Sequence, residues 1–253
     1  MPLRTTTIIA ISIILSMLSA GCAITMSATT KDKAAAMEEM GTSLVLEGSP
    51  REGLVYLLNA ADLDPSSPSI QHNLALVYQN LGEYNLSLQH FQKAISLNPD
   101  FSEAFNNMGV LYSQLKEWDL AIQCFQKAAS DILYKTPHFA YHNMGLVYFQ
   151  KGEYTNAIEN YQKAIKLSPS YLKAYYDLAS AYEASGNLAK GVETYEIAAS
   201  LTPEPWQTHL SIGKLYLKMG RTQEAISEFE FIIETNPRSP AAKEASKLLN
   251  DLK

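Results

Sequence analysis

Apolar and polar positions recur along residues 34–239 with the period of an amphipathic helix, and the whole pattern repeats about every 34 residues. Each period holds two helical stretches separated by a short turn, as in the segments LGEYNLSLQHF and KGEYTNAIENY. Apolar residues lie on one face of each stretch, so the sequence predicts a series of helix pairs. The periods begin at Ala34, Pro68, Ser102, His138, Leu172 and Trp206.

Small residues occupy positions 8 and 20 of every period, which lets the two helices of a pair approach closely. Aromatic residues or leucine at positions 11 and 24 fill the space beside that contact, and proline at position 32 usually ends the second helix. One pair cannot bury its apolar face alone, so the pairs are expected to stack. The pattern resembles the tetratricopeptide repeat. This resemblance implies an all-α fold, a right-handed α-solenoid of six repeats over residues 34–239 with a C-terminal capping helix over residues 240–253.

The period is broken once, in the segment SDILYKTPHFAYHNMG of residues 130–145. The step here is 36 residues, and Leu133 stands where the other periods have proline. Asp131 is expected to cap or turn the chain, and Tyr134 to fill the space left by the missing proline. The simplest alternative is a tolerated loop insertion, since surface loops cost little to lengthen. A third possibility is a change of curvature that shapes a partner's seat.

The amino terminus has the features of a secretory signal. Arg4 precedes an apolar run that is too short to span a bilayer comfortably, and the small residues at 19–21 lead into Cys22. This resembles a bacterial lipobox, which implies a lipoprotein signal peptide over residues 1–21, acylation of Cys22 and a tether over residues 22–33. Ala23 in place of Asp implies sorting to the outer membrane, facing the periplasm. An ordinary signal peptide with a chance cysteine is the alternative.

Composition and motifs argue against catalysis, cofactor binding and metal binding. The net charge of −6 argues against nucleic acid as a partner, and the two cysteines lie in very different contexts. No phosphate-binding loop, dinucleotide fingerprint or nucleophile elbow is present, so we expect no enzyme activity, no cofactor and no small-molecule substrate. His138 and His142 are four residues apart but have no third ligand at a suitable spacing, so no metal site is predicted. Cys124 is expected to be a buried structural thiol.

A binding surface for protein remains. The first helices of the repeats are expected to line a concave face, where amide and imidazole groups accompany a strip of apolar side chains. This uncharged groove suits a neutral or apolar extended segment of a protein partner. The Asn residues at position 6 are common in the repeat and are equally consistent with a structural role. Lys214 and Lys218 make only the last repeat basic. The candidate partner-binding residues are His72, Asn73, Leu76, Asn106, Asn107, Val110, His142, Asn143, Leu146 and Phe149.

The broken period carries a second resemblance. An A-S-D-x-L-Y segment followed by N-x-G-L-V is similar to the PilF/PilW family of type IV pilus biogenesis lipoproteins, to which Tgl is related. This family resemblance implies an outer-membrane pilotin that helps the pilus secretin to insert and multimerise. The rivals are a repeat scaffold for cell-wall or protease complexes and a chaperone-like adaptor of another secretion system. The residues that carry the resemblance are Ala129, Ser130, Asp131, Leu133 and Tyr134, then Asn143, Gly145, Leu146 and Val147.

Overall fold

The computed structural model describes residues 29–252, and every regular element in that range is an α-helix. The predicted all-α class is therefore confirmed. The predicted signal peptide, Cys22 and the first part of the tether lie outside the described residues. The chain divides into two compact units, Met1–Leu111 and Tyr112–Lys253, and the boundary falls within one helix, α5. Within residues 29–252, no helix combines the length and apolar character that a membrane span requires.

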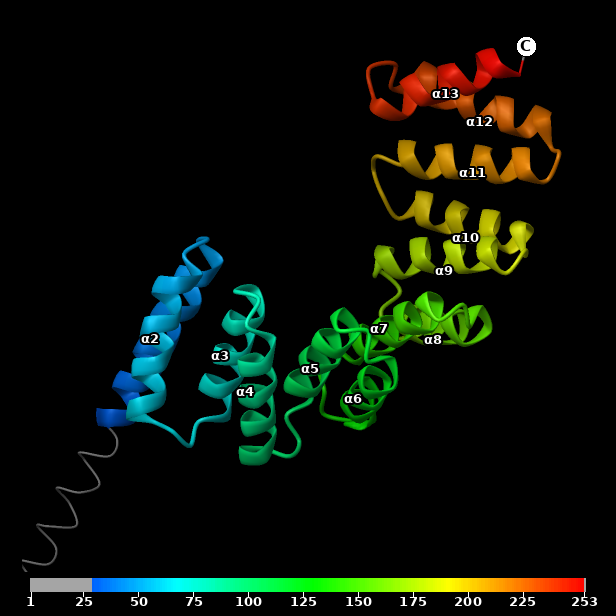
Figure 1. Cartoon of the computed structure of the whole chain (residues 1–253). Coiled ribbons are helices and arrows are strands. Elements are labelled where there is room, and N and C mark those ends of the chain that lie inside the picture. The colour runs from blue at the N-terminus through cyan, green and yellow to red at the C-terminus, as the bar shows by residue number, and fades with distance from the viewer. Residues whose placement is uncertain (1–28, 253) are drawn as a thin grey trace, which may run out of the picture. The chain divides into compact units, whose positions relative to one another are not determined.

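Helices follow one another in pairs joined by tight turns. Residues 29–46 form the first helix, which begins five residues before the predicted start at Ala34, so residues 29–33 belong to this helix rather than to a tether. In Figure 1, the helices from α9 to α13 lie side by side in chain order. The later helices are α2 (Pro50–Leu63), α3 (Pro68–Asn80), α4 (Tyr84–Leu97), α5 (Ser102–Gln114), α6 (Trp118–Ser130), α7 (Pro137–Gln150), α8 (Tyr154–Leu167), α9 (Leu172–Ala184), α10 (Leu188–Ser200), α11 (Trp206–Lys218), α12 (Thr222–Thr235) and α13 (Pro240–Asp251).

Small residues bring helices of a pair into close contact, as the contacts at Gly41, Gly145 and Ser87 show. A Cβ atom added at Gly145 of α7 would lie 2.5 Å from Cε1 of Tyr161 on α8. A Cβ at Gly41 would lie 2.8 Å from Cγ of Leu57, which belongs to α2. Where serine replaces glycine or alanine, its hydroxyl is used: Ser87 Oγ donates to the carbonyl oxygen of Ala75 at 2.7 Å.

The turn inside each pair needs a left-handed backbone conformation at position 15. Glycine provides it in five pairs, with φ between 73° and 87°. The third pair has Lys116 at this position with φ 62°, a conformation that a side chain makes unfavourable. The turn therefore forms in spite of its sequence, and Lys116 is a site of local strain.

The last helix closes the apolar end of the second unit. Ser239 caps α13 by accepting a hydrogen bond from the backbone N–H of Ala242 at 3.0 Å, and Pro240 occupies the first turn. The buried alanines of α13 then pack against Phe229 and Ile232 of α12. A terminal helix of this kind keeps apolar surface of the last pair out of water.

Candidate protein-binding surfaces

The polar residues predicted to line a groove in the first unit bind one another. His72 of α3 lies 5.0 Å from the ring of Phe101 and 5.8 Å from that of Phe91, measured between centroids. Burial lowers the pKa of His72 to about 4, against the opposing effect of a hydrogen bond with Asn73. The imidazole is therefore neutral at neutral pH. Its Nε2 lies 2.9 Å from Nδ2 of Asn107 and can accept the amide hydrogen.

Asn73 and Asn106 also have partners within the chain. Asn73 Nδ2 donates to Oε1 of Glu38 at 2.7 Å. Asn106 is buried, and its Nδ2 lies 3.3 Å from Oδ1 of Asn107. The expectation that these amides stand open to a peptide backbone is therefore not met for Asn106. Leu76 and Val110 are half-buried and remain partly on the surface of this unit.

In the second unit, His142 lies inside the fold. The residue is only 1% exposed, and its Nε2 lies 2.6 Å from Oδ2 of Asp177. The hydroxyl of Tyr171 lies 3.4 Å from the other ring nitrogen. The structure thus places His142 in the contact between α7 and α9 and not on a partner-binding face.

The remaining predicted contacts of this unit are half-buried. Leu146 and Phe149 pack against a buried cluster that includes Tyr161 and Leu178. Asn143 is half-buried on the same helix. Leu146 and Phe149 therefore support the fold as well as the surface, and a charged substitution there would disturb packing.

A recurring ladder explains these contacts. A side chain at position 6 of one repeat bonds a side chain at position 5 of the preceding repeat, 35 residues earlier in the chain. Within residues 29–252 the link is seen with different chemistry, as amide to carboxylate, amide to imidazole, and carboxylate to imidazole. It is a structural use of the inner helices. It encloses His142, whereas a partner contact of the half-buried His72 stays a prediction. The three pairs are Asn73 with Glu38, Asn107 with His72, and Asp177 with His142.

The broken period forms a fixed turn with an apolar tip. The connector of residues 131–136 is six residues long, whereas four of the other five connectors between repeats have four. Asp131 Oδ1 accepts from the backbone N–H of Leu133 at 2.8 Å, and the Asp131 carbonyl accepts from Tyr134 N–H at 3.2 Å. Tyr134 is buried at 7% exposure, while Ile132 and Leu133 are 96% and 82% exposed. Asp131 and Tyr134 therefore hold the turn, and the two aliphatic side chains point into solvent.

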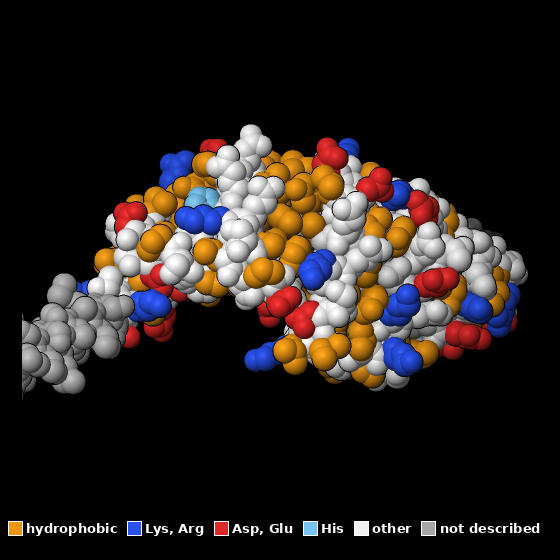
Figure 2. Space-filling view, turned by 90° about the horizontal axis from the view of Figure 1, so that it is seen from below, with side chains coloured by type: hydrophobic (Ala, Val, Ile, Leu, Met, Phe, Trp, Pro, Cys, Tyr) orange, Lys and Arg blue, Asp and Glu red, His pale blue; other side chains and the backbone are white. Residues whose placement is uncertain are grey.

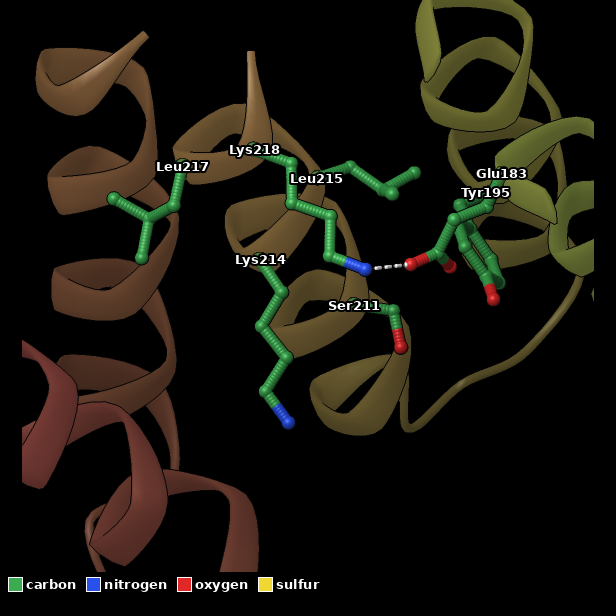
Figure 3. A pocket seen from close by; sticks show the side chains of 7 residues that line it. All are labelled: Glu183, Tyr195, Ser211, Lys214, Leu215, Leu217 and Lys218. Atoms are coloured by element: carbon green, nitrogen blue, oxygen red, sulfur yellow. Dashed lines mark hydrogen bonds and ion pairs between the residues drawn. The ribbon is translucent and has the colours of Figure 1, made fainter. Parts of the chain in front are cut away.

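A cavity of about 330 Å³ lies between α9, α10 and α11 (Figure 3). Leu215 contributes an apolar part of its wall, and Lys218 pairs with Glu183 across it. Lys214, also on the wall, has its Nζ 2.6 Å from Oε1 of Glu244. The sequence predicts only a basic last repeat from these two lysines and gives no sign of the cavity. Their carboxylate partners leave the wall with balanced charge.

For the described part of the chain, the sequence predicts no metal site and a buried structural thiol at Cys124. Among residues 29–252, no group of three or more His, Cys, Asp or Glu side chains is placed to hold a metal ion. Burial raises the pKa of the Cys124 thiol to about 11, so it is protonated and unreactive at neutral pH. On the face drawn in Figure 2, acidic and basic side chains are interspersed, without the basic stripe that follows a nucleic-acid backbone.

Solved structures of several repeat proteins resemble this chain. PilF from Pseudomonas aeruginosa has a TM-score of 0.71 and 21% identity, over 87% of this chain and 99% of that chain. PilW, described as a widely conserved type IV pilus biogenesis factor, has a TM-score of 0.70 and 21% identity, over 83% and 97% of the two chains. MamA has a TM-score of 0.57 and 25% identity, over 67% and 92%. A comparison with curated protein sequences gave no match.

Family models agree with the repeat pattern. The model of the tetratricopeptide repeat matches residues 68–101 and 102–130 in one version and residues 172–205 and 207–239 in another. A further model, described as TPR repeat, matches residues 145–186. Together these matches cover more than half of the sequence, and the four matches to the tetratricopeptide-repeat models each follow one helix pair of the structure. The chain therefore belongs to the tetratricopeptide-repeat proteins.

Proposed function

We propose that this chain is a non-enzymatic outer-membrane lipoprotein, a pilotin that binds the type IV pilus secretin and promotes its insertion and multimerisation. The observation that carries the proposal is the likeness to PilF and PilW, which extends over 99% and 97% of those chains. A shared repeat fold alone is common to many adaptors. A match over nearly the whole length of two such chains, together with the A-S-D-x-L-Y segment, favours this one role.

The anchor is the first part of the proposal. The lipobox-like residues before Cys22 support acylation of that cysteine and a location on the periplasmic face of the outer membrane. Cys22→Ser should abolish labelling with radioactive palmitate and leave the protein unprocessed or away from the outer membrane. A Cys22→Ser protein that fractionates with the outer membrane at normal levels would show that the anchor is not this cysteine.

The partner contact is the second part. The polar ladder engages His72, Asn107 and His142 within the protein, so the apolar surface carries more of the proposed binding. Ile132 and Leu133 suit this role because the Asp131 turn and the buried Tyr134 fix the loop before a partner arrives. A preorganised contact loses less conformational entropy on binding. The occupant is then an apolar segment of the secretin.

Two serine substitutions test this contact without disturbing the core. Ile132→Ser combined with Leu133→Ser removes two aliphatic side chains that are almost fully exposed, so the fold should be unaffected. Capture of the secretin by the tagged chain should weaken at least about tenfold, as expected for a pair of central apolar contacts. Leu201→Ser is the matched control, because Leu201 is an exposed leucine in the connector before α11. Equal capture by the double variant and the control would exclude this loop as the contact. Absence of secretin capture by the unaltered chain would instead favour a general repeat scaffold.

A further inference from the structure

At two positions on the outward face of its second helix, the first repeat carries apolar residues where the other five repeats carry polar ones. Positions 22 and 25 lie on that face, and in repeats two to six both positions are exposed and occupied by glutamine, glutamate or serine. In α4 they are Gln89 and Gln92. The first repeat has Val55 and Leu58 there instead, on α2. The other five repeats of the same chain thus provide an internal standard from which α2 departs at both positions.

Both aliphatic side chains are on the surface. Val55 is 56% exposed and Leu58 is 40% exposed, whereas Leu57 and Ala60 of the same helix are fully buried against the next pair. Isolated exposed aliphatic residues are ordinary. Two on one helix face, at positions that are polar in every other repeat, point to a surface that is covered. Arg51 is exposed one turn before Val55 on the same side of the helix.

The position of the proposed anchor indicates what covers this face. Cys22 precedes the first described residue by seven positions, and seven fully extended residues span at most ~25 Å. An acyl chain on Cys22 therefore holds the first repeat close to the bilayer, whatever path the intervening residues take. The repeat that is nearest to the anchor in sequence is also the one with aliphatic residues at positions 22 and 25.

We propose that the outer face of α2 rests on the lipid surface. Val55 and Leu58 enter the interfacial region, and Arg51 lies at the level of the headgroup phosphates. The inference rests on the proposed acylation of Cys22. Two aliphatic residues are too few to bind a membrane alone, but the anchor makes their contact intramolecular and so raises the effective concentration of lipid. The contact orients the first repeat on the membrane.

A fluorescent probe beside the two residues tests the contact. Asn59→Cys adds an exposed thiol next to Leu58 and leaves both aliphatic side chains in place. Lys93→Cys is the matched control, because Lys93 is the equivalent exposed residue of α4. Cys124 will not react at neutral pH because it is buried with a pKa of about 11. The mature acylated chain, labelled with an environment-sensitive dye, is reconstituted in phosphatidylethanolamine and phosphatidylglycerol vesicles whose acyl chains are brominated.

The brominated acyl chains quench the dye only if the dye lies in the membrane. We expect quenching of more than half of the signal at residue 59 and little at residue 93. Val55→Gln with Leu58→Gln, which copies the residues of α4, should abolish the quenching at residue 59 in the folded protein. An unquenched dye at residue 59 on a chain whose Cys22 acylation is verified by mass spectrometry would overturn this inference and leave the anchor intact. Unacylated Cys22 would overturn the anchor itself. A blue-shifted but unquenched dye would mean that protein covers the face, which also contradicts the inference.

Discussion

Tyr134 lies in a connector but is buried like a core residue. Truncating its side chain measures how much its packing stabilises the connector of residues 131–136. Tyr134→Ala removes a ring that is almost wholly buried. An aromatic side chain buries ~150–250 Å², which at ~25 cal/mol per Å² corresponds to roughly 4–6 kcal/mol. A connector can partly collapse into the space, so the expected loss in the free energy of unfolding is ~2–4 kcal/mol. The Asp131 turn should form but lose its anchor to the core.

Urea unfolding followed by far-ultraviolet circular dichroism gives the free-energy difference, and hydrogen exchange shows where the loss falls. Repeat arrays can open in parts, so the amides of α6 and α7 should lose most protection. Leu133→Ala is the control, because its exposed side chain should contribute less than ~0.5 kcal/mol. A change below ~1 kcal/mol for Tyr134→Ala, or an equal change for both variants, would refute the packing argument.

Three further predictions concern single residues. Lys116→Gly should raise stability by about 1 kcal/mol, since glycine relieves the positive φ; an unchanged or lower melting temperature would contradict this. The folded-state pKa of His72, about 4, lies below its unfolded value of 6.5, so its neutral form contributes stability that is fully present above pH 6.5 and lost as the pH falls towards 4. His72→Gln should remove at most ~3 kcal/mol of that decline, and parallel stability profiles for the two proteins would disprove the assignment. Cys124 should resist a thiol reagent at neutral pH in the folded protein and react fully in urea; rapid reaction without denaturant would argue against its burial.

The repeat pattern predicted the helix pairs because the helical periodicity of apolar residues and the recurring small and aromatic residues point to the same elements. Glycine at residue 145 and tyrosine at residue 161 fall on positions whose contact recurs between Gly41 and Leu57 and between Gly213 and Phe229, so one alignment locates these contacts. The start of the first helix was harder to predict, because residues 29–33 are polar and show no apolar periodicity. The helix extends there although its apolar face begins only at Ala34, which is buried.

The candidate site was harder to predict because exposure depends on the neighbouring repeat. His142 occupies a position that faces the groove side, yet Asp177 and Tyr171 enclose it. A signal was present in the sequence: complementary polar residues 35 positions apart, such as Asn73 with Glu38. The cavity beside Lys218 depends on how three helices meet, and no residue spacing indicates its volume.

The most direct test of the proposed function is the state of the secretin in a strain that lacks this gene. The account predicts that secretin shifts from its heat-stable multimer to monomer on a denaturing gel, with loss of surface pili and twitching. The intact gene should restore the multimer, and the Cys22→Ser form should not. Normal multimers and normal pili in the deletion strain would contradict the pilotin proposal.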